Sequence, residues 1–211
     1  MPLDIWLAFA AASTALLVIP GPTIMMVLSY ALTQGRRVAV ASALGVATGD
    51  LIAMTLSVIG LGALFLASAL AFTILKWVGA AYLVYLGVKM LRSAGRIDTP
   101  STLMDKPAGQ SAGKVFRDLT TVTALNPKSN TFFIAFVPQF IQADQAFAPQ
   151  AAILIATFVT IAALNALVFA LAANAMRARI TRPTVQAWLT RAGGATLVGM
   201  GVLTATLRRA T

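Results

Sequence analysis

The sequence predicts an all-α, polytopic integral membrane protein with six transmembrane helices, arranged as two inverted repeats of three helices each. Three observations lead to this fold class. The 211 residues are 59% hydrophobic and only 10% charged, and their mean hydropathy of +0.85 is far above that of a soluble domain. Six apolar runs, each about 20 residues long, follow one another along the chain. The two halves of the chain also resemble each other in sequence.

Composition excludes several function classes. The net charge of +10 comes from 16 Lys and Arg residues against 6 acidic ones. These basic residues lie between apolar runs and not on a common face, so we expect no nucleic-acid partner. The absence of Cys and His removes thiolate chemistry and the usual catalytic base. We therefore expect neither an enzyme nor a protein that holds a metal or a cofactor.

The first apolar run is predicted to be a membrane span and not a signal peptide. Asp4 stands where a signal peptide would carry a basic residue, and the run is too long for a cleaved segment. The last span has the shortest purely apolar stretch, because Arg191 interrupts it. The polar connection at about 93–117 divides one domain, 1–211, into repeat one (about 1–92) and repeat two (about 118–211). The predicted spans are 5–30, 38–64, 70–91, 119–141, 151–176 and 186–207.

Basic residues predict how the spans are oriented. The first, third and fifth connections are rich in Lys and Arg, whereas the second and fourth carry almost none. By the positive-inside rule the odd connections face the cytoplasm, and both termini lie outside. Arg208 and Arg209 disagree with this orientation, so a cytoplasmic C-terminus stays open. The basic residues of the odd connections are Arg36, Arg37, Arg92, Arg96, Lys106, Lys114, Arg117, Arg177, Arg179, Arg182 and Arg191.

An internal repeat relates the two halves. Residues 78–88 and 192–202 share six identities in eleven positions, although apolar composition inflates such a match. Because each half has an odd number of spans, the two halves must cross the membrane in opposite senses. This is the plan of secondary transporters, in which broken helices meet at the substrate site. The repeat sets Asp50 against Asn165, and residues 20–22 against residues 126–128.

Each half also has a proline break inside an apolar run. A proline in a helix interior costs about 3 kcal/mol of helix stability, and this cost rises in lipid because no water satisfies the freed carbonyl groups. New half-helices are expected to start at Pro22 and, behind an Asn126 N-cap, at Pro127. Both begin near the midplane with free N–H groups and positive dipole ends, which suit an anion. Lys128 and Asp50 add opposite charges roughly 12–18 Å below the inner surface. A small molecule with a carboxylate and an ammonium group fits these two poles.

These features select the candidate substrate-binding residues. Asp50 is also the candidate proton-coupling group, because apolar surroundings favour a neutral carboxyl group and a nearby cation favours an ionised one. Structural alternatives stay open: the prolines as kinks, Asp50 and Asn165 as interhelical hydrogen-bonding groups, and Lys128 as a snorkelling or paired cation. The candidates are Pro20, Gly21, Pro22, Thr23, Asp50, Asn126, Pro127, Lys128 and Asn165.

Four motifs together carry a resemblance to a known family: "PGP" at 20–22, "GVATGD" ending at Asp50, "KWVGAAYLVYLGVKMLR" at 76–92 and "NPKSNTFFIAFVPQF" at 126–140. With these motifs the chain resembles the lysine exporter (LysE) superfamily and, within it, the homoserine/threonine exporter-like (RhtB) group, over essentially its whole length. The resemblance implies a multi-pass protein of the bacterial inner membrane that exports amino acids or related metabolites, driven by the proton gradient. It does not name the substrate.

Two other function classes stay open. A small-ion or metal-cation exporter or channel is disfavoured, because one midplane carboxylate without His, Cys or Glu completes no ligand set. A non-transporting membrane scaffold would explain the glycine-rich helices, but not two helix breaks and two opposite charges at one depth. The expected partners are a small-molecule substrate, protons and the lipid bilayer. A homodimer is compatible with the sequence, which determines no oligomeric state.

Overall fold

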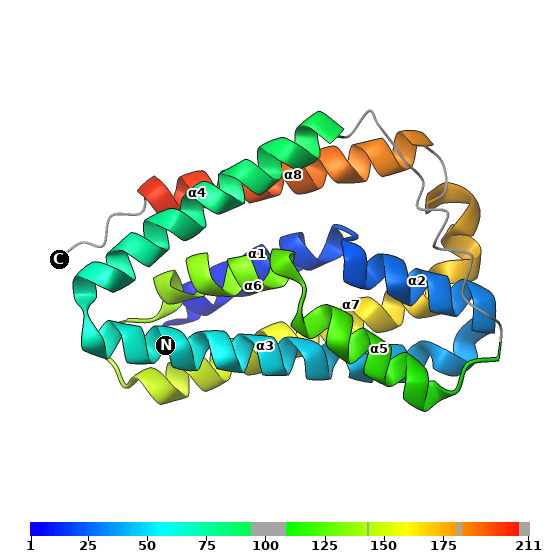
Figure 1. Ribbon diagram of the computed structural model, residues 1–211, viewed down its shortest axis with the longest axis horizontal. Coiled ribbons are helices and arrows are strands. Elements are labelled where there is room, and N and C mark those ends of the chain that lie inside the picture. Colours follow the sequence, from blue (N-terminus) through cyan, green and yellow to red (C-terminus); the bar gives the residue numbers. More distant parts are fainter. Residues whose placement is uncertain (94–108, 143, 181–182, 207–211) are drawn as a thin grey trace.

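The computed structural model describes residues 1–93, 109–142, 144–180 and 183–206, and these residues form helices and their connections (Figure 1). The all-α class predicted from the sequence is therefore confirmed for this part of the chain. The elements are α1 (Leu3–Val18), α2 (Pro22–Gln34), η1 (Gly35–Val38), α3 (Ala39–Ala67), α4 (Ala69–Ser93), α5 (Ala112–Ala124), α6 (Pro127–Ala135), η3 (Val137–Phe140), α7 (Phe147–Ile180) and α8 (Pro183–Thr206).

The first apolar run is broken where the sequence predicts, between α1 and α2. Ile19 has extended backbone angles of φ −77° and ψ 113°, because a residue that precedes proline is excluded from the helical region. Gly21, which precedes the second proline, is also extended and is the N-cap of α2. Pro22 is then the first residue of α2, where its missing N–H group costs no helical hydrogen bond.

The second predicted break separates α5 from α6. Asn126 is extended, with φ −69° and ψ 112°, and its side-chain oxygen accepts a hydrogen bond of 3.0 Å from the backbone N–H of Lys128. Pro127 follows as the first residue of α6. The predicted N-cap and first-turn proline are therefore both confirmed, and the two breaks use the same local chemistry.

The start of α5 differs from the predicted start of the fourth span. The helix begins at Ala112, before residue 119, because the Ser111 hydroxyl accepts a hydrogen bond of 3.3 Å from the Lys114 N–H and so caps the first turn. Residues 94–108 of the predicted 93–117 connection lie outside the described residues, as do Arg208 and Arg209. Gly35 ends α2 with a positive φ of 72°, which favours glycine at this turn.

Glycines bring α3 against α5 and so position Asp50. A Cβ atom on Gly45 would lie 2.7 Å from the Phe116 carbonyl oxygen, and one on Gly49 would lie 2.6 Å from Thr123 Cβ. Both distances are shorter than any tolerable contact, so only glycine permits this approach. The small-residue pattern before Asp50 therefore packs α3 against α5, and it holds Asp50 in the protein interior.

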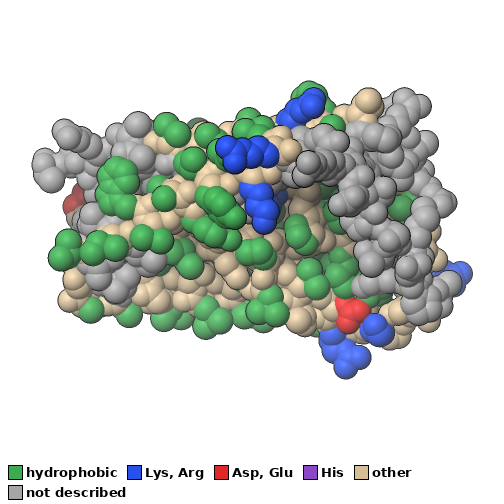
Figure 2. Space-filling model, turned by 45° about the horizontal axis from the view of Figure 1, so that its top comes forward, with side chains coloured by type: hydrophobic (Ala, Val, Ile, Leu, Met, Phe, Trp, Pro, Cys, Tyr) green, Lys and Arg blue, Asp and Glu red, His purple; other side chains and the backbone are tan. Residues whose placement is uncertain are grey.

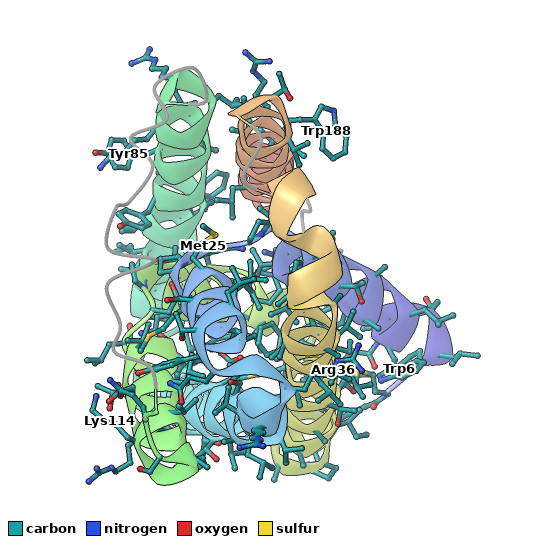
Figure 3. The ribbon with its side chains drawn as sticks, turned by 90° about the vertical axis from the view of Figure 1, so that its right-hand side faces the viewer. Trp6, Met25, Arg36, Tyr85, Lys114 and Trp188 are labelled. Atoms are coloured by element: carbon teal, nitrogen blue, oxygen red, sulfur yellow. The ribbon has the colours of Figure 1, made fainter. Side chains whose placement is uncertain are left out.

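Helices α4 and α8 form an antiparallel pair along one side of the molecule (Figures 1 and 3), and α4 also packs against α6, where a Cβ on Gly79 would lie 2.5 Å from Ala135 Cβ. Their closest approach is at Gly87 and Gly194, where a Cβ on either residue would lie 2.6 or 2.7 Å from the other's carbonyl oxygen. Tyr85 of α4 and Trp188 of α8 point away from the pair on opposite sides (Figure 3). These two helices contain the segments that the internal repeat related most clearly.

The surface is strongly apolar. Large hydrophobic side chains are exposed along several helices, including Leu70 at 71% and Leu56 at 66%, and hydrophobic side chains cover much of the face seen in Figure 2. Two helical stretches among the described residues, Pro22–Ala63 and Phe147–Ala173, are long and apolar enough by themselves to cross a membrane. α1, α2, α5 and α6 are each shorter than a span of about 20 residues, because the two breaks divide them.

Candidate functional site

A pocket lies where the two helix breaks face α3 and α7. Six of the nine candidate residues from the sequence line this pocket, although they come from four helices and the two breaks. Its walls are formed by Leu16, Leu17, Ile19, Gly21, Thr23, Ile24, Val46, Asp50, Asn126, Lys128, Ser129, Ala162 and Asn165. The residues predicted to share one depth in the membrane therefore do meet in space.

One wall is the C-terminal end of α1, where the break leaves carbonyl groups without helical partners. Pro20 has no N–H group to offer to the carbonyl of Leu16, four residues earlier. The Lys128 ammonium donates to that carbonyl at 2.7 Å and to the carbonyl of Ile19 at 2.8 Å. Asn165 of α7 donates its amide to the carbonyl of Leu17 at 2.9 Å. Side chains of α6 and α7 thus complete the end of α1.

The opposite wall contains the N-terminal ends of α2 and α6. The Asn126 amide donates a hydrogen bond of 3.0 Å to the hydroxyl of Thr23, and the Thr123 hydroxyl lies 3.5 Å from the same oxygen. The first turns of both half-helices therefore lie side by side. Gly21, the N-cap of α2, has no side chain that could accept from the first-turn N–H groups of α2, and it lies in the wall of the pocket.

Asp50 supplies the negative charge of the pocket. Its side chain is only 1% exposed, and its Oδ1 atom has no hydrogen-bond partner among the residues that the structure describes. The Lys128 ammonium belongs to the wall of the same pocket. A buried carboxylate oxygen without a donor carries a large desolvation penalty, so it is unusual unless a ligand or a proton satisfies it. Asp50 is thus the acceptor that the site leaves open.

Three candidate residues do not line the pocket. Pro20, Pro22 and Pro127 shape the breaks, and their rings are not part of its wall.

The sequence analysis did not predict Ser129, which lines the pocket and whose counterpart in the repeat is Thr23. Extending the aligned motif by one residue would have found it. It also missed the α1 carbonyls, because backbone acceptors leave no signature in residue type. Asn130, which does not line the pocket, donates to the Ala124 carbonyl and so completes the end of α5.

Two groups of packed side chains lie on the helices that form the pocket, outside its wall. On the side of α2 and α5, Tyr30 is fully buried and donates a hydrogen bond to Asp118, which also pairs with Lys114 at 3.1 Å. On the side of α1 and α6, phenylalanine rings pack with centroids 4.8 to 6.4 Å apart. These rings belong to Phe9, Phe132, Phe133, Phe136, Phe140 and Phe158.

The space within the pocket is small. It offers about 20 Å³ to the centre of a water molecule, which is room for roughly one water. Any ligand of several heavy atoms therefore requires the helices around the pocket to move apart.

Comparison with known proteins gives a consistent result. The family model described as LysE type translocator matches residues 14–208. The chain is 37% identical to the homoserine/homoserine lactone efflux protein of Salmonella typhimurium, over the full length of both chains. It is 32% identical to an uncharacterized membrane protein of Vibrio cholerae, over 99% of this chain and all of that one. No solved structure matches the chain.

Proposed function

The chain belongs to the LysE type translocator family, a family of membrane transporters and not of enzymes, and we propose that it is a secondary exporter of an amino acid or a related small zwitterion. The observation that carries this proposal is the pocket, where one unpartnered carboxylate faces two half-helix N-termini and a lysine ammonium. The name of the Salmonella typhimurium relative makes homoserine and homoserine lactone the first substrates to test.

The two poles of the pocket suit the two charges of such a substrate. The substrate ammonium would donate to Asp50 Oδ1, which has no other donor. The substrate carboxylate would face the first-turn N–H groups of α2 and α6. An ammonium group has three N–H donors, and Lys128 uses two of them on the α1 carbonyls, so one remains for the carboxylate. Thr23, Asn126 and Asn165 hold these groups in place through their own hydrogen bonds.

Proton coupling follows if Asp50 exchanges the substrate ammonium for a proton. With substrate bound, Asp50 is ionised, and its proton has been released to the cytoplasm. When the site opens outward and the substrate departs, a proton from the more acidic side protonates Asp50 and travels inward on the return step. The Asp50 carboxyl group is bound either to the substrate ammonium or to a proton, so a buried carboxylate is never left without a partner.

We propose the membrane arrangement predicted from the sequence: six spans in two inverted repeats, in the inner membrane of bacteria. Two features support it. The two broken stretches, α1 with α2 and α5 with α6, each add up to the length of one span. The basic turn at Arg36 and Arg37, the start of α5 and the end of α7 also lie at one end of the molecule (Figure 1). By the positive-inside rule this end faces the cytoplasm.

Everted membrane vesicles provide the test of this function. Vesicles that contain the protein should accumulate radiolabelled homoserine when an inward-acidic proton gradient is imposed, and accumulation should stop when an uncoupler removes the gradient. A channel would let the label equilibrate without accumulation, and a scaffold would give the same uptake as vesicles without the protein. Either outcome contradicts the proposed export.

A comparison of homoserine with homoserine lactone also tests whether Lys128 contacts the substrate carboxylate. Homoserine has a free carboxylate, whereas homoserine lactone has an ammonium but a neutral ester. Lys128→Met should therefore weaken binding of homoserine about tenfold more than binding of the lactone, since a charge-assisted hydrogen bond contributes roughly 1.5 kcal/mol or more. Lys89→Met, at an exposed position on α4, is the matched control. Equal losses for both ligands would remove Lys128 from contact with the carboxylate.

A further inference from the structure

The C-terminal end of α1 has the features of a small-cation site. Proline breaks leave its last carbonyls without N–H partners, and the helix dipole adds negative character there. The carbonyls of Leu16 and Ile19 converge on one point, since both lie within 2.8 Å of the same nitrogen atom. The Asp50 carboxylate lies in the wall of the same pocket. In membrane transporters, groups of this kind hold a metal cation or a proton.

The cation at this point is part of the chain. α1 has no basic residue in its last turn, and the ammonium that satisfies its carbonyls comes from Lys128, 112 residues beyond Leu16. The lysine stem passes Gly21, where an added Cβ would lie 3.3 Å from Lys128 Cδ and 3.7 Å from Nζ. The glycine in the break thus leaves room for the stem of the lysine.

From this geometry we infer that the break after α1 is a monovalent-cation site in which the tethered ammonium of Lys128 is the resident cation. Lys128 is a positioning residue in this role: it holds the end of α1 against α6 before any substrate binds. The role is separate from its remaining N–H donor, and it does not depend on which substrate is exported. A small primary ammonium ion should occupy the site when the lysine side chain is removed.

The alternative is that Lys128 serves the substrate alone. The two roles predict different changes in the stability of the substrate-free protein when the Lys128 ammonium is removed. If the ammonium only waited for a ligand, removing a buried charge would leave stability unchanged or increase it. If the ammonium completes α1, removing it leaves two carbonyls unsatisfied and lowers stability.

The experiment uses the purified full-length protein in detergent, without substrate, and measures Tm by tryptophan fluorescence. Trp6 reports directly on α1, because its indole N–H donates to the Thr157 hydroxyl of α7 at 2.9 Å. In choline chloride, Lys128→Ala should have a lower Tm than the wild type. Methylammonium chloride at the same ionic strength should raise the Tm of Lys128→Ala by roughly 2–4 °C and leave the wild type unchanged.

Two controls make the result specific. Lys89→Ala removes an exposed lysine and should behave as the wild type in both salts. Tetramethylammonium chloride supplies a cation without N–H donors and should not raise the Tm of Lys128→Ala. The inference is overturned if Lys128→Ala is as stable as the wild type in choline, or if methylammonium stabilises both proteins equally.

A second variant covers the case in which Lys128→Ala does not accumulate in the membrane. Lys128→Gln keeps two N–H donors near the α1 carbonyls without the charge. It should accumulate, with a Tm below that of the wild type, and should gain nothing from methylammonium because the amide fills the site. Loss of both variants while Lys89→Ala accumulates would contradict the predicted rescue by an amide and overturn the inference. Because no substrate is present, failure here leaves the proposed export function untouched.

Discussion

Asp50 is the residue on which the proposed exchange of proton and substrate depends. It lies directly after Gly49, whose contact with α5 holds the carboxyl group in the interior at 1% exposure. Its Oδ1 atom has no donor, although the surrounding residues Thr23, Asn126, Lys128 and Asn165 all have hydrogen-bond partners. Asp50 Oδ1 is therefore the acceptor in the pocket that a substrate ammonium or a proton can satisfy.

Replacing Asp50 by asparagine should abolish uphill export while the protein stays folded in the membrane. The amide keeps the shape of the side chain but cannot bind and release a proton, so the gradient can no longer drive the substrate. The measurement is accumulation of labelled substrate in everted vesicles with an imposed proton gradient, normalised to the amount of protein. Asp4→Asn, in the exposed first turn of α1, is the matched control. If Asp50→Asn still builds a substrate gradient, the coupling group lies elsewhere.

At the scale of helices, glycines determine which elements approach each other most closely. α3 meets α5 through Gly45 and Gly49, and α4 meets α8 through Gly87 and Gly194. The first contact positions Asp50 in the pocket, whereas the second joins two helices that contribute no residue to the wall of the pocket. The two contacts have different consequences for function, although the residue type is the same.

Gly87→Ala should destabilise the α4–α8 pair by about 1–3 kcal/mol, because the added methyl group would lie 2.6 Å from the Gly194 carbonyl oxygen. The expected result is a lower Tm of the purified protein. Gly199→Ala on α8 is the control, since a Cβ there meets nothing within 4 Å. That control should be neutral or slightly stabilising, because alanine favours helix over glycine. Equal Tm values for both variants would contradict the close approach of α4 and α8.

For the whole molecule, the small pocket and the paired breaks suit the alternating access that the proposed export requires. Tyr30 contacts Asp118 between α2 and α5, and phenylalanine rings pack around α1 and α6. A pocket with room for roughly one water must open on one side to load the substrate and on the other to release it. We expect α1, α2 and α6 to move, because each of these half-helices has one end at the pocket.

The orientation in the membrane can be tested directly, because the natural sequence has no cysteine and any introduced thiol is unique. Gly113→Cys lies in the first turn of α5, and Ala148→Cys lies in the first turn of α7; both positions are exposed. A membrane-impermeant maleimide should label Ala148→Cys in spheroplasts and Gly113→Cys only in everted vesicles. The cysteine-free parent controls for background. Labelling of both positions from the same side would refute the proposed six-span topology.

The sequence alone determines much of this site, wherever the cause is local. The prolines exclude the helical conformation of the residue before them, so the breaks near Gly21 and Pro127 could be predicted from neighbouring residues. A helix rises about 1.5 Å per residue, so counting along the chain predicted a similar depth for Asp50 and Lys128, and both residues line the pocket. The resemblance to the LysE family was likewise visible in short motifs, and the family comparison confirms it.

Only the tertiary structure decided how these groups are paired. The sequence suggested that Lys128 faces a substrate or Asp50, whereas its hydrogen bonds go to the carbonyls of Leu16 and Ile19. Asn165 similarly joins the Leu17 carbonyl, 148 residues away in the chain. Such contacts depend on how helices pack, and backbone acceptors are present at every residue, so no residue pattern marks them. Local sterics can therefore be read from the sequence, but the partners of a buried charge follow from packing.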